Sequence, residues 1–494
     1  MQKPGHRLTK WLVRVLLLGG AVVLTIVLVF AFQARLRLSE LQAWHRLRLE
    51  EEFYAGRGDV ESFADYLRLE QRLFDELRTR LLDDPGSADP HTIGRYHPGS
   101  APARRALETP YNRSYELTTP DPRGAVLLVH GLSDSPYSMR ALAEIFHAQG
   151  YHVLVLRLPG HGTIPSMLRD VTWQDWYAAV AIAAREAARR AGPGRPFLAG
   201  GHSTGAALLA LHAVRALSDT ALPAPQRLYL LSPAIGISEL AVLTNVISGL
   251  SFLPWFEKSQ WIDVLPEYDP YKYNSFPVNA AKQIDRLTRE LRRALGAAGE
   301  AGRLGGMPRI VVFHSLVDAT VKSTEVAHGL LGLLPPRGHE LVLFDVNRHA
   351  ALLGLIAPAP IAHLERIRNA TDLPFGLTLI GNRAETSLEI AAYTRAAGSA
   401  EVRVEDLPLA WPAGVFSLGH VAIPFPPDDP VYGLTPAADG LPRFALGAFP
   451  ARGESGALLV PPGMLARLRS NPFFSVIRSK VEETCREDAE RAPR

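Results

Sequence analysis

One pentapeptide carries the most specific chemical signal in this chain of 494 residues. Gly201, His202, Ser203, Thr204 and Gly205 form a Gly-x-Ser-x-Gly pattern that follows the strand-like run PFLAGGHS and opens the Ala- and Leu-rich run TGAALLALHAV. A sharp turn from strand to helix can hold a serine in a strained conformation with its hydroxyl exposed, provided that both flanking residues are small. The pattern therefore predicts Ser203 as a nucleophile. The alternative is a glycine-rich turn with an incidental serine.

A second turn could supply the donors that a nucleophilic serine needs. The oxyanion of a tetrahedral intermediate must be stabilised by positioned N–H groups. The backbone N–H of Thr204, directly after the serine, is one candidate. The other is the backbone N–H of Leu132 in the run His130-Gly131-Leu132, which follows a strong strand-like run. Backbone donors have no side-chain signature, so this assignment depends on position alone.

The elements around these turns alternate in type. Short β-branched or Leu-rich runs predict strands, and the stretches between several of them predict helices at about 139–150, 173–190 and 204–214. The predicted strands are AVLLVHG at 125–131, YHVLVLRL at 151–158, PFLAGGHS, RLYLLSP and RIVVFHS at 309–315. This alternation predicts an α/β fold with a mostly parallel, doubly wound sheet. In such sheets the site lies at the carboxyl ends of the strands.

The run VLLVHGLSDSPYSMRALAEIFHAQGYHVLVLRLPGHG, followed by TWQDW and AGGHSTG, resembles the monoacylglycerol lipase and carboxylesterase branch of the α/β-hydrolases. The resemblance spans roughly residues 113–320. It implies the α/β-hydrolase fold and a catalytic triad in the order serine, acid, histidine. The acid would follow the strand RIVVFHS, where Asp318 stands, and would orient the imidazole. Asp269 and Asp285 are alternatives, but neither follows a predicted strand.

Two histidines compete for the role of base. His349 has the spacing after Asp318 that the family resemblance implies, and follows the strand-like run ELVLFDV. His420 lies further on, in the string FSLGHV between Pro412 and Pro424, which resembles the family's histidine turn. Because insertions in surface loops cost little free energy, context outweighs spacing and favours His420. Residues 351–411 would then be an insertion, in which the run GLTLIGN could extend the sheet.

Residues 235–285 fall where this family places its cap over the site. Aromatic residues are frequent in this stretch and could form a dry channel for an acyl chain, or pack the core of the cap. They are Phe252, Trp255, Phe256, Trp261, Tyr268, Tyr271 and Tyr273.

The first 112 residues have a different character. Residues 15–32 are uncharged and apolar, which predicts a transmembrane anchor rather than a cleaved signal peptide, with residues 1–34 as cytoplasmic tail and anchor. The basic residues on both sides of the run are balanced, so the positive-inside rule decides little. The N-terminal position favours an extracytoplasmic, periplasmic hydrolase unit at 113–494. Residues 35–112 are expected to form a helical stalk, or a helix packed on that unit with Asp59 as its cap, followed by a Pro- and Gly-rich linker.

Composition excludes several classes of protein. The formal net charge of +3 is not gathered in blocks, so nucleic acid is not an expected partner. The single cysteine, Cys485, can form neither an intramolecular disulfide nor a cysteine-based metal site. Serine chemistry of this kind requires no metal or organic cofactor, and none is predicted.

The predicted function is hydrolysis of carboxylic esters, such as acylglycerols or lysophospholipids, by a membrane-anchored serine hydrolase. Ser203 would form the acyl-enzyme, with His420 as base and Asp318 as acid. The same triad could serve a peptidase, a thioesterase or an acyltransferase, because fold does not fix function. A membrane-tethered binding protein without turnover is a further alternative.

Overall fold

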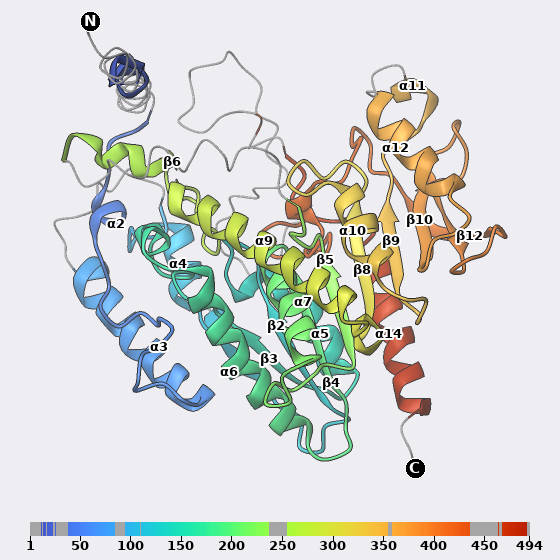
Figure 1. Ribbon diagram of the computed structural model, residues 1–494, viewed down its shortest axis with the longest axis horizontal. Helices are drawn as coiled ribbons and strands as arrows, with labels where there is room; N and C mark the ends of the chain where they lie inside the picture. The colour runs from blue at the N-terminus through green and yellow to red at the C-terminus, as the bar shows by residue number, and fades with distance from the viewer. Residues whose placement is uncertain are drawn as a thin grey trace, which may run out of the picture.

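The computed structural model describes residues 11, 13–15, 17–22, 25, 38–83, 94–108, 110–236, 254–353, 358–434, 463 and 467–491. Within them one sheet has the strand order β1-β3-β2-β4-β5-β8-β9-β10-β11-β12 (Figure 1). Its strands are β1 (Tyr115–Leu117), β2 (Ala125–Val129), β3 (His152–Leu156), β4 (Phe197–His202), β5 (Arg227–Leu231), β8 (Arg309–Ser315), β9 (Glu340–Phe344), β10 (Gly376–Asn382), β11 (Glu389–Arg395) and β12 (Arg403–Ala410). Neighbours from β3 to β10 pair in parallel, whereas β1, β11 and β12 pair antiparallel. The mostly parallel sheet is confirmed.

Helices cover both faces of the sheet (Figure 1). One face carries α5 (Arg140–Ala148) and α14 (Phe474–Arg491), and the other carries α6 (Trp173–Ala191), α7 (Thr204–Ala216) and α9 (Val278–Glu300). In β2, Val126 and Leu128 pack toward α5 and α14, whereas Leu127 and Val129 pack toward α6, α7 and α9. Successive side chains of a strand point to opposite faces, so a strand buried on both faces must be apolar throughout. This explains the uninterrupted apolar runs.

The described part of the predicted cap is small. It contains a two-stranded sheet of β6 (Trp261–Asp263) and β7 (Phe276–Pro277), and residues 237–253 lie outside the described residues. The expected boundary at 285 falls inside α9, which begins at Val278 and packs against the sheet in the same layer as α6 and α7.

Residues 351–411 extend the sheet. The short α11 (Ala350–Leu353) and α12 (Pro358–Asn369) precede β10, which pairs in parallel with β9 as the run GLTLIGN suggested. The hairpin of β11 and β12 follows at the sheet edge. The chain then returns toward the centre, where His420 lies in a short helical turn, His420–Ala422.

The N-terminal segment packs on the α/β unit and is not a free stalk. Its helix α3 (Phe63–Leu77) buries Phe63 and Tyr66 in the core that α6 and α7 share. The helix is capped by Ser62, whose side chain accepts from the Asp65 N–H, and not by Asp59 as expected. A capping box of this kind satisfies the N–H groups that the first turn leaves unpaired.

A buried ion cluster attaches this segment to the loop after β3. The Arg157 guanidinium donates to Glu52 Oε1 at 3.0 Å and to Glu70 Oε2 at 3.1 Å, and all three side chains are less than a tenth exposed. Arg157 also donates to the His161 carbonyl, and the Gly160 N–H donates to Glu52. Residues 38–83 therefore help to fix the PGHG loop at 159–162.

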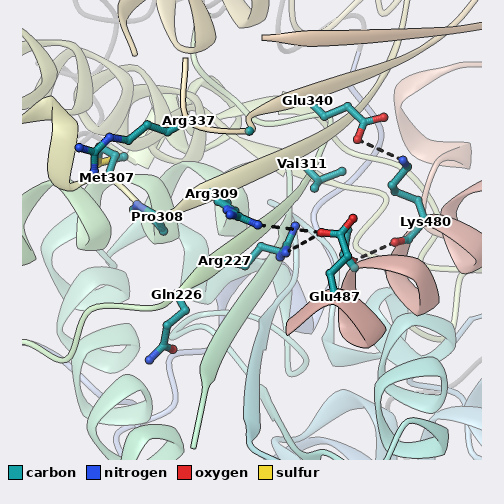
Figure 2. A pocket seen from close by; sticks show the side chains of 12 residues that line it. Gln226, Arg227, Met307, Pro308, Arg309, Val311, Arg337, Glu340, Lys480 and Glu487 are labelled. Carbon is teal, nitrogen blue, oxygen red and sulfur yellow. Dashed lines mark hydrogen bonds and ion pairs between the residues drawn. The ribbon is translucent and has the colours of Figure 1, made fainter. Parts of the chain in front are cut away.

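At the opposite end of the sheet, ion pairs hold α14 against the starts of β5, β8 and β9. Figure 2 shows this cleft, of about 640 Å³, with Arg227 directed at Glu487 and Lys480 at Glu340. Arg227 also pairs with Asp488 at 2.7 Å. Because these strands run in parallel, their starts lie at the edge away from Ser203, which follows the end of β4.

Among the described residues, no helix is long and apolar enough to cross a membrane. Of the anchor predicted at 15–32, the structure describes only residues 15, 17–22 and 25, so most of that prediction lies outside the described residues.

Candidate active site

Ser203 lies in the strained turn that the sequence predicts between β4 and α7. Its backbone has φ 51° and ψ −110°, in the half of conformational space that residues with a Cβ avoid. A Cβ on Gly205 would lie 2.1 Å from the carbonyl oxygen of Val129, and one on Gly201 would lie 2.7 Å from the Ala206 nitrogen. Both flanking positions therefore require glycine for a physical reason, and the turn presents Ser203 at the carboxyl end of the sheet.

The structure brings Asp318 and His420 together, although they are far apart in the chain. Asp318 follows β8, and its Oδ1 accepts from the N–H groups of Thr320 and Val321 at 2.8 and 2.9 Å. Its Oδ2 lies 2.7 Å from His420 Nδ1, in a buried contact. If the proton sits on Nδ1 and is donated to the carboxylate, the Nε2 lone pair is available to accept a proton.

The charge on Asp318 is stabilised by its surroundings. Burial by itself would raise the pKa of this carboxyl group, but the charge of His420, its hydrogen bond and the nearby His314 outweigh burial and hold the pKa well below its usual range. His314 Nδ1 lies 3.9 Å from Asp318 Oδ2 at the end of β8. Nothing in the local sequence distinguishes His314 from an ordinary strand residue, so the sequence did not identify it.

The other candidate base, His349, forms a hydrogen bond with the backbone of the helix that follows it. It lies in the loop after β9, where its Nδ1 accepts from the Ala351 N–H at 3.3 Å, at the start of α11. Of the alternative acids, Asp269 is buried and paired with Arg469, and Asp285 pairs with Arg289 on α9. The structure instead pairs Asp318 with His420, and the His420 carbonyl oxygen lies 3.3 Å from Nε2 of His202, the residue before Ser203.

The predicted oxyanion donors flank the serine. A Cβ on Gly131 would lie 2.9 Å from His202 Nδ1 and 3.3 Å from Ser203 Cβ, so the turn before Leu132 packs directly against the elbow. Within the described residues, neither the Leu132 N–H nor the Thr204 N–H donates to another group of the protein. Two unpaired backbone donors beside a serine hydroxyl are what an oxyanion requires.

His130 braces this turn. Its Nδ1 lies 2.8 Å from the Gly131 carbonyl oxygen, and its Nε2 accepts from the Leu158 N–H at 3.0 Å. Burial lowers the pKa of His130 to about 4, so the ring is neutral at physiological pH and can accept at Nε2. The conspicuous His-Gly pair thus joins the loops after β2 and β3.

His202 forms a second polar chain beside the triad, which the sequence did not reveal. Its Nδ1 lies 3.2 Å from Asp134 Oδ2, and its Nε2 lies 3.3 Å from the carbonyl oxygen of His420. Lys272 pairs with the other Asp134 oxygen at 3.0 Å. Burial lowers the pKa of His202, and a neutral ring can donate to only one of its two acceptors. His202 therefore links the oxyanion turn to the loop that carries His420.

The described aromatic residues of the predicted cap are buried packing residues, and Tyr273 also lines a small cavity beside His420. Tyr271 stacks on Tyr137 with ring centroids 4.0 Å apart, and Trp261 meets His45 edge to face. Trp261, Tyr268, Tyr271 and Tyr273 are all buried. Phe252 and the side chains of Trp255 and Phe256 lie outside the described residues. The described rings therefore fit the packing alternative better than an open acyl channel.

Comparisons with known proteins match the part of the chain that contains Ser203 and Asp318. The family described as serine aminopeptidase, S33, matches residues 120–335, which include the elbow, the oxyanion turn and Asp318. This match covers under half of the chain and supports the predicted α/β-hydrolase superfamily. A thermostable monoacylglycerol lipase from Bacillus sp. (strain H-257) is 49% identical over 55 residues, which are 11% of this chain and 22% of that lipase. The match thus spans about a fifth of the relative's length.

Solved structures of lipolytic enzymes match the chain over about half its length. The structure reported for LipS and LipT, two metagenome-derived lipolytic enzymes, has 21% identity and a TM-score of 0.37, and the match covers 52% of this chain and 98% of that one. The Paleococcus ferrophilus monoacylglycerol lipase has 17% identity and a TM-score of 0.35, with 47% and 88% covered. The monoglyceride lipase of Saccharomyces cerevisiae has 13% identity and a TM-score of 0.35, with 47% and 82% covered.

The predicted superfamily and its lipase-like branch are confirmed by the family match and the curated relative. The family match and the curated relative also support the predicted class of enzyme, a serine hydrolase.

Proposed function

We propose that this α/β-hydrolase cleaves carboxylic esters through an acyl-enzyme on Ser203, with His420 as general base and Asp318 as the acid that orients it. The observations that carry the proposal are the buried contact of 2.7 Å between Asp318 and His420 and the strained backbone of Ser203, at φ 51°. Backbone strain and a buried carboxylate both cost free energy, and they persist at functional sites where the surrounding structure enforces them.

The reaction follows from these positions. His420 Nε2 takes the proton of the Ser203 hydroxyl while Oγ attacks the ester carbonyl carbon, and the oxyanion forms at the N–H groups of Leu132 and Thr204. The intermediate collapses by breaking the bond to the alcohol oxygen, which takes the proton from His420. Water then attacks the acyl-enzyme, giving its proton to His420, and the second intermediate releases the carboxylic acid and restores the Ser203 hydroxyl. Asp318 remains ionised and stabilises the imidazolium.

Peptide hydrolysis is the second candidate, because the matching family is described as a serine aminopeptidase. An aminopeptidase must accommodate the positive α-ammonium group of its substrate. The described charged side chains that line the small cavity beside His420 are Lys272, Arg467 and Arg469, and of these Arg467 is the one without an acidic partner among the described residues. Cations there would repel an ammonium group, so ester hydrolysis is the favoured reaction.

A direct test compares esters with amides on the full-length protein in detergent. p-Nitrophenyl esters of increasing acyl length, 1-monoacylglycerols and aminoacyl p-nitroanilides would be assayed with wild type and with Ser203→Ala. We expect ester turnover that the variant reduces by up to about a million-fold, as in related triads. The matched control is Ser218→Ala, on the surface after α7. Turnover of anilides but not esters would replace this function with the peptidase.

We further propose that the chain is tethered to a membrane through residues 15–32, with the hydrolase unit on the extracytoplasmic side. The support is the uncharged length of that run, which approaches the roughly 20 residues needed to span a bilayer. Full-length protein should stay with membranes in alkaline carbonate, and added protease should reach the hydrolase unit in spheroplasts but not in intact cells. Full-length protein recovered in the carbonate supernatant would contradict the tether.

A further inference from the structure

A small cationic cavity borders the loop that carries His420. Its volume is about 100 Å³, which is room for one small polar group. The described side chains that line it are Lys272, Tyr273, Asn274, Val421, Phe425, Tyr432, Arg467 and Arg469. Three of them are cations and none is acidic. The cavity therefore has the charge and size to suit an anionic group.

The three cations differ in how their charges are balanced. Lys272 pairs with Asp134 at 3.0 Å, and Arg469 pairs with Asp269 at 3.1 Å. Arg467 has no ion pair within the described part of the chain, and the carboxylate that acts on it electrostatically, Asp318, is already engaged by His420. Arg467 is also exposed, so its guanidinium can receive a ligand without first losing a partner.

The larger cleft at the other end of the sheet provides a contrast (Figure 2). It is also rich in cations, but Arg227 is paired with Asp488 at 2.7 Å and Lys480 with Glu340 at 3.1 Å. These two ion pairs hold α14 to the strands, and both cations already have a carboxylate partner. Arg337 also lines this cleft without an ion pair among the described residues, so what separates the two sites is position: the small cavity adjoins the loop that carries His420, whereas this cleft lies at the starts of the strands.

The position of the cavity indicates which part of a substrate would reach it. Val421 directly follows His420, and Lys272 is linked through Asp134 and His202 to the carbonyl of His420. The leaving alcohol must approach the His420 ring to receive its proton. A cavity at the His420 loop therefore lies on the alcohol side of the ester.

We propose that this cavity binds an anionic group, a phosphate or a carboxylate, on the alcohol portion of the ester, with Arg467 as its main ligand and Lys272 in support. Arginine suits both groups because its planar donors match two oxygens at once. The inference rests on the proposed ester hydrolysis and narrows its substrates to esters of acidic alcohols.

The test uses four butyryl esters that differ only in the alcohol: glycerol 3-phosphate, glycolate, glycerol and choline. For the full-length protein, kcat/KM should be about ten- to a hundred-fold higher for an anionic ester than for the glycerol ester, as charge-assisted hydrogen bonds allow. The choline ester should be the poorest. Comparing the phosphate with the glycolate ester identifies which anion the cavity takes.

Three variants assign the effect. Arg467→Met should abolish the preference for anionic esters, Arg467→Lys should restore part of it, and Arg337→Met at the far cleft should leave it unchanged. High salt should weaken the preference, since exposed charges are screened. Equal kcat/KM for neutral and anionic esters in wild type, or a preference that survives Arg467→Met, would overturn the proposal.

A binding measurement separates this inference from the proposed function. Ser203→Ala cannot turn over, so calorimetry can follow its binding of the butyryl ester of glycerol 3-phosphate. We expect binding that adding Arg467→Met weakens at least about tenfold, even if the wild type hydrolyses none of the esters. No binding, or binding that Arg467→Met does not change, would refute the anionic subsite whatever the outcome for ester hydrolysis.

Discussion

Replacing Arg157 with methionine tests whether the N-terminal segment is an integral part of the hydrolase unit. The variant removes the one cation between Glu52 and Glu70, and all three side chains are less than a tenth exposed. It leaves two buried carboxylates facing each other, and breaking a buried ion pair costs about 3–5 kcal/mol. Glu70→Gln should cost less, roughly 1–3 kcal/mol, because Arg157 keeps Glu52 and only hydrogen bonds are weakened.

Equilibrium unfolding of the full-length protein in urea, followed by tryptophan fluorescence, measures these differences. The matched control is Arg189→Met, which breaks a surface pair with Glu186 whose arginine is 66% exposed, and should cost under about 1 kcal/mol. The expected order of destabilisation is Arg157→Met, then Glu70→Gln, then Arg189→Met. If Arg157→Met costs no more than the surface control, residues 38–83 are not held by this cluster and the reasoning fails.

Three further predictions concern the site. Asp318→Asn should lower kcat by about ten-thousand-fold in ester assays, since it removes the charge that orients His420. The folded-state pKa of Asp318 is depressed, so the ionised carboxylate stabilises the fold above about pH 4 and this stabilisation is lost at lower pH. Melting curves of wild type and variant should therefore converge at acid pH. His202→Phe should reduce kcat by about tenfold, and His202→Gln, which keeps one donor, should recover part of that loss. Gly205→Ala should fail to fold, as circular dichroism would show, because its Cβ would meet the Val129 carbonyl at 2.1 Å; a folded, active Gly205→Ala would contradict the elbow geometry.

The parts of this structure that the sequence predicted are those with a local signal. The strand-to-helix turn at Ser203 and the central strands each depend on neighbouring residues, which leave a pattern in the chain. Two histidines competed for the role of catalytic base. The spacing after Asp318 favours His349, whereas the surrounding loop sequence favours His420. The strands β10 to β12 occupy the intervening chain, and the structure places His420 beside Asp318.

Other features left a weak signal or none. The strand β12 is largely exposed and carries charges and Pro408, so it lacks the apolar pattern of a central strand. Helix α9 has a strong amphipathic pattern, but its first residues were assigned to the cap. The contacts of Arg157 with Glu52 and of His202 with His420 join residues 105 and 218 positions apart, and no local pattern reports such pairings.

Labelling with a fluorophosphonate probe tests most directly whether Ser203 is a nucleophile activated by His420. The rate of adduct formation would be followed by intact mass, and the modified residue identified by peptide mapping, for wild type, His420→Ala and His349→Ala. We predict one adduct on Ser203 in wild type, a similar rate in His349→Ala, and a rate at least about a thousand-fold lower in His420→Ala. An adduct on another residue, or a His420→Ala variant that labels as fast as wild type, would contradict this catalytic site.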